Sequence, residues 1–261
     1  MTDTQTLAGT TVVVTRPRKQ AGRLSGLIEA KGGEVILFPT LEILEPLKTK
    51  QLTSILDRFK QFDMAIFVSV NAVEGAMRLI GAKLPSHLKL AAVGNTTREA
   101  VEQQWHQPVI CPDKGANSEA LLATQALQEI EGQRIVIFRG QGGRELLAQT
   151  LNKRGAAVEY AEVYRRAKPD ANPAELANRQ PSIELITATS NESLQNLYEM
   201  TDFKQHDWLL SRQLIVMSER TAELAKQLGF RSPAVVAKES NDQGLVNAML
   251  AWRAQNQNNN S

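Results

Sequence analysis

Two arginines stand where runs of β-branched and aliphatic residues end. Arg16 closes the run in "TTVVVTR", and Arg139 closes the run in "QRIVIFR". Such runs predict buried strands of a parallel sheet, and ligands of parallel α/β proteins bind at the carboxyl ends of the strands. An arginine at that edge could bind a carboxylate or a phosphate. The alternative for each arginine is a solvated strand end or a pair with a nearby carboxylate.

Small polar residues and glycine follow other apolar runs, where the chain turns from strand to helix. They are Ser69 and Asn71; Gly94, Asn95, Thr96 and Thr97; Ser190 and Asn191; and Ser218 and Thr221. Helix N-capping alone favours Ser, Thr and Asn at such places. Helix starts also present free backbone N–H groups and the positive end of the helix dipole, which bind anions. Together with the two arginines, these residues predict a carboxylate- or phosphate-binding edge.

Other kinds of chemistry find little support in the sequence. Neither the G-x-G-x-x-G nor the G-x-x-x-x-G-K-[ST] pattern is present, which argues against a dinucleotide or a nucleoside triphosphate. His87, His106 and His206 lie in polar surroundings without the spacing of metal ligands, so no metal is predicted. Cys111 ends an apolar run and is interpreted as a small buried side chain, because no motif places a histidine to activate it.

The elements that must position these residues follow from the alternation of short apolar runs with amphipathic helical patterns. This alternation predicts an α/β protein with parallel sheets. The first unit is a strand over 11–15, a helix whose Leu24, Leu27 and Ile28 share a face, Gly32 at the helix end, and a strand over 34–38. Further strands are predicted at 64–68, 90–93, 109–111, 135–138, 185–187, 214–217 and 234–237.

An internal repeat relates the two halves of the chain. Residues 9–38 align without a gap on 132–161, with identical residues in strand core, strand end, helix face, helix cap and following strand. The matched pairs are Gly9 and Gly132, Val13 and Val136, Arg16 and Arg139, Leu24 and Leu147, Gly32 and Gly155, and Val35 and Val158. Three later units also resemble one another: "FVSVNAV" and "TATSNES", "AAVGNTTREAV" and "IVMSERTAEL", and "VICPDKGANSEALL" and "VVAKESNDQGLV".

Composition bounds the class of protein. The 261 residues, of which 42% are apolar, can bury one large core or two modest ones. A net charge of +2 without a basic cluster, and 5% aromatic residues, argue against a nucleic-acid partner. One cysteine excludes an internal disulfide framework, and neither a secretory signal nor a membrane-spanning run is seen. We therefore expect a soluble cytoplasmic protein with no membrane contact, whose polar tail, 254–261, is disordered.

Four stretches, taken with their order and spacing, resemble bacterial uroporphyrinogen-III synthases. They are "VVVTRPRKQAGRLSGLIEAKGGEVILFPTLEI", "FVSVNAVEG", "AAVGNTTREA" and "LNKRGAAVEYAEVYRR". The resemblance extends from about Gly9 to Trp252. It implies two parallel-sheet α/β domains joined by a two-segment extended linker. The first domain would comprise 1–38 and 168–253, the second 44–160, and the linker 39–43 and 161–167.

The resemblance also implies a reaction. The family's substrate is hydroxymethylbilane, a linear tetrapyrrole with eight carboxylates, and the family closes it into a ring with loss of water. The last pyrrole is inverted through a spirocyclic intermediate, and no cofactor is needed, so positioning of the substrate carries most of the catalysis. This function further implies a cytoplasmic monomer of tetrapyrrole (haem) biosynthesis that could receive its substrate by transient hand-over from the preceding pathway enzyme.

Site residues are carried over from the family one by one. Tyr164 in "AEVYRR" matches the family's tyrosine, whose phenol could protonate the departing hydroxyl. Without the family, an aromatic that packs one crossing segment against the other is almost as good an interpretation. Thr97, Thr221 and Ser69 match polar residues that hydrogen-bond acetate and propionate groups.

The remaining polar residues are assigned to substrate binding on weaker grounds. The family pattern is met less cleanly at "VSVN", and the alignment at "TATSN" could shift by one residue. The set predicted to bind substrate is Thr97, Thr221, Ser69, Asn71, Ser190, Asn191, Ser218, Gly94, Arg16 and Arg139. A non-catalytic two-domain cleft protein that binds an anionic small molecule would carry the same strand-end signals. Turnover of hydroxymethylbilane would distinguish the two functions.

Overall fold

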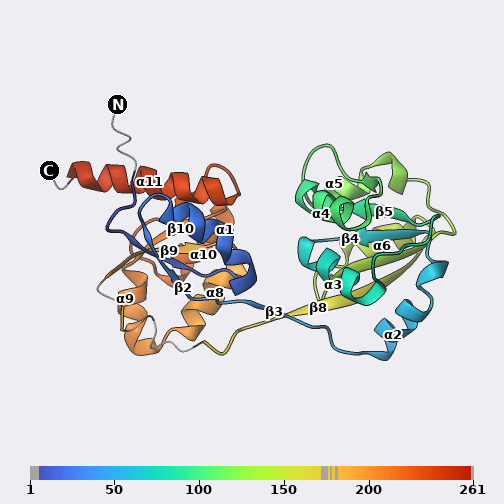
Figure 1. Ribbon diagram of the computed structural model, residues 1–261, viewed down its shortest axis with the longest axis horizontal. Helices are drawn as coiled ribbons and strands as arrows, with labels where there is room; N and C mark the ends of the chain where they lie inside the picture. Colours follow the sequence, from blue (N-terminus) through green and yellow to red (C-terminus); the bar gives the residue numbers. More distant parts are fainter. Residues whose placement is uncertain (1–5, 172–175, 177, 180–181, 260–261) are drawn as a thin grey trace. The chain divides into compact units, whose positions relative to one another are not determined.

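The chain forms two compact units, each built on its own sheet. A computed structural model describes residues 6–171, 176, 178–179 and 182–259 (Figure 1). Unit 1 comprises the residues up to Glu42 together with those from Ala167 onward, and unit 2 comprises Ile43–Arg166. The α/β class with parallel sheets, predicted from the alternating pattern, is confirmed.

Unit 1 contains a five-stranded sheet in the order β11-β10-β9-β1-β2, in which neighbouring strands are parallel. The strands are β1 (Thr11–Val14), β2 (Glu34–Leu37), β9 (Ile183–Ala188), β10 (Gln213–Val216) and β11 (Val235–Val236). All four residues of β1 are buried because helices cover both faces of the sheet. This double burial explains why the strand is recognisable as an uninterrupted apolar run.

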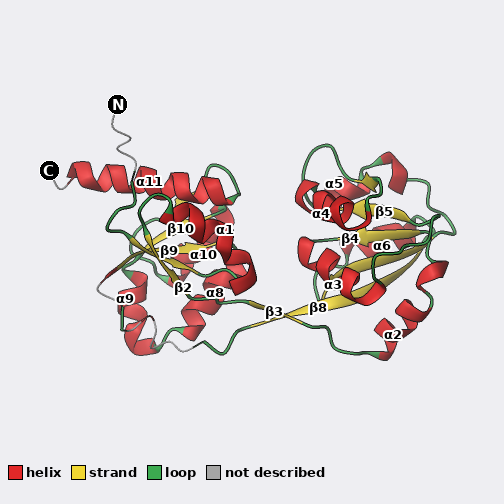
Figure 2. Ribbon diagram, viewed as in Figure 1, coloured by secondary structure: helices red, strands yellow, loops and turns green. Residues whose placement is uncertain are grey.

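The helices of unit 1 lie on both faces of its sheet (Figure 2). They are α1 (Arg18–Glu29), α8 (Asn191–Met200), α9 (His206–Leu210), α10 (Glu219–Leu228) and α11 (Asp242–Asn259), with a 3-10 turn, η4, at Phe203–Gln205. Leu24 and Ile28 of α1 pack with α11 on the face that Val12 and Val14 present. Val13 faces the core that contains α8, α9 and α10.

Unit 2 contains a six-stranded sheet in the order β3-β8-β7-β4-β5-β6. Its strands are β3 (Glu42–Leu44), β4 (Met64–Phe67), β5 (Lys89–Ala92), β6 (Val109–Ile110), β7 (Arg134–Gly140) and β8 (Ala157–Ala167). The pairs β8–β7, β7–β4, β4–β5 and β5–β6 are parallel. Strands β3 and β8 contain most of the residues assigned to the linker, 39–43 and 161–167, and that linker stays a prediction.

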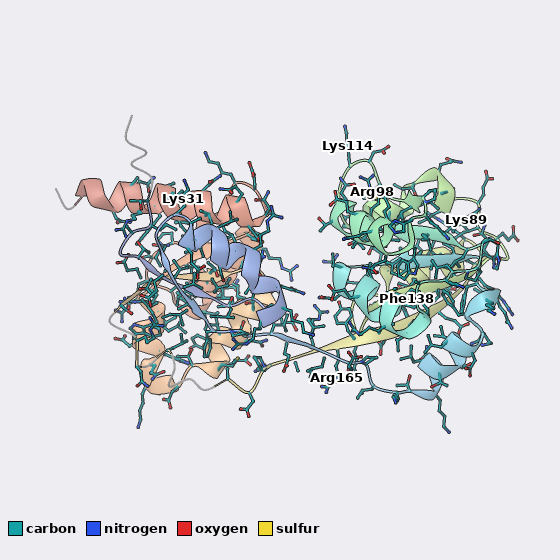
Figure 3. The ribbon with its side chains drawn as sticks, viewed as in Figure 1. Lys31, Lys89, Arg98, Lys114, Phe138 and Arg165 are labelled. Atoms are coloured by element: carbon teal, nitrogen blue, oxygen red, sulfur yellow. The ribbon has the colours of Figure 1, made fainter. Side chains whose placement is uncertain are left out.

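Helices also cover both faces of the unit 2 sheet (Figure 2). They are α2 (Lys50–Asp57), α3 (Val70–Ile80), α4 (Asn95–Trp105), α5 (Ser118–Leu122) and α6 (Leu146–Lys153), with 3-10 turns η1 (Phe59–Gln61) and η2 (Gln125–Leu127). Helices α2, α3 and α4 share a core with Phe67 and Phe138, whose rings stack with centroids 5.1 Å apart. Phe138 is labelled in Figure 3. Helices α5 and α6 pack with Met64 and Ile66 on the opposite face.

The end of the described chain is helical. Helix α11 continues to Asn259, while 260 and 261 lie outside the described residues, and the disorder of 254–261 stays a prediction. The packed part of α11 reaches Trp252, whose indole N–H donates to Gln213 Oε1 at 3.2 Å. Once a helix is nucleated, each further residue adds a backbone hydrogen bond at little cost, so the helix outlasts its apolar pattern. Among the described residues, none of the helices is both long and apolar enough to cross a membrane.

Candidate functional site

Tyr164 and Ser69 lie together at the carboxyl edge of the unit 2 sheet. Ser69 follows β4 and caps α3, where its Oγ accepts a hydrogen bond from the Ala72 N–H at 3.2 Å. Tyr164 is near the end of β8 and is buried, and its hydroxyl oxygen lies 3.2 Å from Ser69 Oγ. Figure 3 labels Arg165, the next residue on this strand. The predicted proton donor and one predicted binding residue are therefore hydrogen-bonded neighbours.

Glycine makes room for the Tyr164 ring. The β7–β8 register shifts between Arg139 and Gly140, so that Gly140 pairs with Tyr164. A Cβ on Gly140 would lie 2.6 Å from Cε2 and Cζ of the ring, closer than two carbon atoms can approach. The backbone N–H of Gln141 then donates to the Tyr164 carbonyl at 2.8 Å. A register irregularity of this kind re-aims side chains near functional sites, and here it sets the direction of the tyrosine.

Arg139 is held by two carboxylates and a ring. Its Nη1 lies 2.9 Å from Glu145 Oε1, and its Nη2 lies 3.4 Å from Glu162 Oε1. The guanidinium carbon stands 3.5 Å from the centroid of the Tyr160 ring, a cation–π arrangement. The pairing with carboxylates is the alternative that the sequence left open, and the substrate-binding role of Arg139 stays a prediction.

Tyr160 remains neutral to a higher pH than an ordinary tyrosine. Burial raises the pKa of its phenol, and the negative charge of Glu145 raises it further. The nearby backbone N–H of Ala148 and the positive charge of Arg139 act in the opposite direction. The phenol of Tyr160, which lies beside the guanidinium of Arg139, is therefore uncharged at physiological pH.

A pocket of about 170 Å³ opens beside these groups, entirely within unit 2. Its polar lining comes largely from Arg139, Arg144, Arg166, Tyr160 and Tyr164, and none of the described residues that line it is acidic. The sequence did not single out Arg144, Arg166 or Tyr160. The double glycine before Arg144, three residues after a strand-end arginine, is the pattern that could have indicated a loop built for close approach.

Thr97 lies at a second helix start of unit 2. Gly94 caps α4, and a Cβ there would lie 2.6 Å from Ala116 Cβ, so the close approach of the neighbouring loop accounts for this glycine. Thr97, three residues later, is 6% exposed. Among the described residues, its hydroxyl has no hydrogen-bond partner. The hydroxyl oxygen is not one of the fully buried polar atoms that lack a partner. Asn71, in the first turn of α3, is half-buried.

The equivalent residues of unit 1 are bonded to one another. Thr221 Oγ1 donates to Asn191 Oδ1 at 3.0 Å and lies 2.9 Å from Ser218 Oγ. Ser218 caps α10 and Ser190 caps α8, where it accepts from the Ser193 N–H at 3.1 Å. The structure thus brings four of the predicted residues together at the carboxyl edge of the unit 1 sheet. N-capping accounts for Ser69, Ser190 and Ser218, which are the cap residues themselves.

Arg16 forms a close ion pair within unit 1. Its Nη1 lies 2.5 Å from Asp242 Oδ1 at the start of α11, and both side chains are mostly buried, at 17% and 11% exposed. Arg23 also approaches the same carboxylate, at 3.9 Å, from an exposed position. As for Arg139, the carboxylate pair is the alternative that the sequence left open. The binding role of Arg16 stays a prediction.

The residues that the sequence set aside give no competing site. Among the described residues, no group of three or more His, Cys, Asp and Glu side chains could hold a metal ion. Cys111 is half-buried, and burial raises the pKa of its thiol, which lowers the fraction of reactive thiolate.

The fold and these edges define a class: a two-unit parallel α/β protein with clustered hydroxyls and arginines at the carboxyl ends of its strands. Comparison with known proteins identifies the family. The profile of uroporphyrinogen-III synthase HemD matches residues 22–247. Uroporphyrinogen-III synthase of Escherichia coli (strain K12) is 34% identical over 238 residues, which cover 88% of this chain and 96% of that protein. The chain belongs to the uroporphyrinogen-III synthase family, as the resemblance in its sequence predicted.

Further relatives agree with this assignment. Uroporphyrinogen-III synthase of Synechococcus elongatus is 30% identical over 263 residues, covering 96% of this chain and 98% of that protein. The crystal structure of a mutant uroporphyrinogen III synthase from the extremely thermophilic bacterium Thermus thermophilus superimposes with a TM-score of 0.60 at 17% identity, covering 95% of this chain and 99% of that one. At that identity the structural likeness supports the fold alone. The family membership makes this chain an enzyme of the cyclising lyase type in porphyrin biosynthesis, which sets aside the non-catalytic cleft protein.

Proposed function

We propose that Tyr164, supported by Ser69, is the proton donor when this chain converts hydroxymethylbilane to the inverted, type III ring. In the reaction of the family, the terminal hydroxyl leaves as water and an electron-poor azafulvene forms. The substituted carbon of the last pyrrole attacks this azafulvene, and the spirocyclic intermediate breaks and recloses with that ring inverted. The protein must supply one proton to the departing oxygen and hold the chain in the less accessible geometry.

The 3.2 Å contact between Ser69 Oγ and Tyr164 OH carries the proposal. Ser69 Oγ already accepts from the Ala72 N–H, so its own proton is free to point at the tyrosine oxygen. The phenol proton is then directed away from the serine and toward a bound substrate. After transfer, the serine hydroxyl stabilises the phenolate. The proton that is lost when the last pyrrole regains its aromaticity restores the phenol.

The hydroxyls and arginines at the strand ends are proposed to bind the carboxylates of the substrate. Thr97 is the strongest member of this set, because the residue is only 6% exposed and its hydroxyl lacks a protein partner in the part of the chain described here. Thr221, Asn191, Ser218 and Ser190 would exchange bonds with one another for bonds to the ligand. Asn71, Gly94, Arg16 and Arg139 complete the proposed binding set.

The wider setting is proposed on the family and on composition. The chain would act as a cytoplasmic monomer that takes hydroxymethylbilane from the preceding pathway enzyme. Sedimentation of the purified chain tests the monomer, and transfer of substrate between the two enzymes tests the hand-over.

A matched pair of tyrosine variants tests the proton donor. Tyr164→Phe keeps the ring and removes the proton, and general acid catalysis is worth about a hundredfold to ten-thousandfold in rate. We expect kcat with hydroxymethylbilane to fall within that range while measurable activity remains, because positioning is retained and water can replace the phenol.

Tyr198→Phe is the control for the same substitution. Tyr198 lies on α8 of unit 1, where its ring packs on His206 with centroids 4.2 Å apart. The kcat of Tyr198→Phe should equal that of the wild type. Equal kcat for the wild type and Tyr164→Phe would remove Tyr164 from the role of acid.

A further inference from the structure

The pocket beside Tyr164 is lined by three arginines and, within the described residues, by no acidic side chain. Its volume is about 170 Å³, and it opens to solvent. Such a space accepts a short side chain of a few heavy atoms. The chemistry of the lining and the size of the space both fit one acetate or propionate group.

The arginines of this pocket are engaged to different degrees. Arg139 is 12% exposed, and two carboxylates and the Tyr160 ring already fix its guanidinium. Arg144 is 70% exposed, and its contact with Glu119, which is 54% exposed, is long at 3.7 Å. An exposed pair of this length contributes little to stability. A ligand carboxylate could therefore replace Glu119 at little cost, whereas replacing a partner of Arg139 would cost more.

The loop that carries Arg144 is fixed to the strand of the proposed proton donor. Gln141 N–H donates to the Tyr164 carbonyl, and Gly142 N–H donates to Glu162 Oε1 at 3.0 Å. Gly142 and Gly143 have φ angles of 72° and 118°, which residues with a Cβ rarely adopt. The double glycine turns the chain so that Arg144 lines the pocket, within a few residues of an anchor on Tyr164.

We propose that this pocket holds one carboxylate side chain of hydroxymethylbilane and that Arg144 binds it. The proposal rests on the proposed function of the chain. A guanidinium matches a carboxylate through two parallel hydrogen bonds, which orients the ligand as well as holding it. The bound group would be placed beside Tyr164, so that Arg144 positions the substrate relative to the phenol without taking part in the proton transfer.

Steady-state kinetics with hydroxymethylbilane test the assignment. Arg144→Gln should raise KM about tenfold to a hundredfold, the value of a charged hydrogen bond, and should change kcat little. The KM of Arg144→Lys should lie between that of the wild type and that of Arg144→Gln, because lysine keeps the charge but lacks the planar guanidinium. Arg78→Gln is the control: it removes an equal charge from the end of α3, where Arg78 pairs with exposed Glu45 at 3.2 Å, and its KM should be unchanged.

The outcomes separate this inference from the proposed function. A wild-type KM for Arg144→Gln, or an equal rise for Arg78→Gln, overturns the role of Arg144 while the formation of the type III isomer stands. Failure of the wild-type chain to form the type III isomer overturns both. If Arg144→Gln does not fold, the KM of Arg144→Lys decides, and a wild-type value there contradicts the proposal.

Discussion

Thr97 of unit 2 and Thr221 of unit 1 occupy the same place in two copies of one helix start, yet their hydroxyls differ. Each is the third residue of its helix, in "GNTT" and "SERT". Thr221 bonds to its cap residue Ser218 and to Asn191 on the adjacent helix. Thr97 has glycine as its cap residue, which offers no side chain, and its hydroxyl is unpaired in the described residues.

A one-residue shift contributes to this difference. The sequence pairs Asn71 with Asn191, but the structure places the cap residues at Ser69 and Ser190. Val70 of unit 2 therefore stands where unit 1 has Asn191, and an apolar side chain cannot bond to a threonine. The structure thus selects the one-residue shift that the sequence left open: Asn71 is the second residue of α3, whereas Asn191 is the first residue of α8.

The strand-end arginines differ in the same sense. Arg16 of unit 1 has one close carboxylate from the far end of the chain. Arg139 of unit 2 is shared by two carboxylates and stacks on a tyrosine that borders a pocket. The two copies of the repeat thus share their strands and helix starts. In unit 1 the polar residues at the strand ends pair with groups of the same unit, whereas unit 2 leaves a hydroxyl and a cationic pocket for a ligand.

The largest effect in this comparison is expected at Gly140 of unit 2. Gly140→Ala would place a methyl group 2.6 Å from the Tyr164 ring and force the phenol away from Ser69. We expect kcat to fall by up to about a hundredfold, the cost of a misplacement of about 1 Å, and stability to fall by about 1–3 kcal/mol. Enzyme assays and denaturant titration measure the two effects.

Gly22→Ala in α1 of unit 1 is the control, because none of the described atoms outside its chain neighbours and its own helix backbone lies within 4 Å of its Cβ position. It should leave kcat unchanged and should raise stability by roughly 0.5–1 kcal/mol, the difference between alanine and glycine in a helix. A wild-type kcat for Gly140→Ala would show that the fit between this glycine and Tyr164 does not matter for activity.

The next largest effect is expected at the ion pairs of the two arginines. Loss of the carboxylate partner should lower the free energy of unfolding more in unit 1 than in unit 2. Asp242→Asn leaves Arg16 mostly buried beside a neutral amide, which should cost about 1–3 kcal/mol in the free energy of unfolding. Glu162→Gln should cost less than about 1 kcal/mol, because Arg139 keeps Glu145 and the amide oxygen can still accept from Gly142 N–H. Urea titration of both variants checks the order, and the reverse order would contradict the contrast between the two arginines.

Substitution of Thr221 should lower the stability of the protein, whereas substitution of Thr97 should weaken substrate binding. Thr221→Val removes two hydrogen bonds at nearly constant volume and should lower the free energy of unfolding by about 1 kcal/mol. Thr97→Val removes none that the described residues show, so its stability should match the wild type while KM for hydroxymethylbilane rises. Equal losses of stability in the two variants would refute the distinction between an occupied and an open hydroxyl.

The smallest effect concerns Tyr160. Because the pKa of its phenol is raised in the folded state, the unfolded chain releases this proton first as the pH rises. The contribution of Tyr160 is therefore fully present below the ordinary tyrosine pKa of about 10 and is lost above it. In denaturant titrations from about pH 8 to 11, on either side of that value, Tyr160→Phe should lose stability less steeply than the wild type, with Tyr198→Phe as control. Identical slopes would exclude a raised pKa.

The parallel strands of both units were predictable because burial on both faces leaves a continuous apolar run, as in β1 and β7. The two copies of the repeat were visible for the same reason. Strand β8 was not predicted as a strand over its length, since charged residues interrupt its apolar ones in "AVEYAEVYRRA". The cap residues Ser69, Ser190 and Ser218 follow from local helix chemistry and were found without tertiary information.

The partners of the site residues could not be predicted in this way. Asp242 reaches Arg16 from a helix at the far end of the chain, and no local pattern links the two. Whether Thr97 or Thr221 has a free hydroxyl depends on the residue that a neighbouring helix presents. The pocket depends on the meeting of a loop at 140–144 with β8, a contact that only the register of the sheet creates.

The isomer that the chain makes from hydroxymethylbilane is the most direct test of the account. Hydroxymethylbilane closes without a catalyst to the symmetric type I ring, so ring closure alone does not identify the enzyme. The purified chain, treated with chelator and given no cofactor, should convert fresh hydroxymethylbilane to the type III isomer, as chromatography of the oxidised products would show. Type I product alone, at the rate seen without protein, would contradict the account.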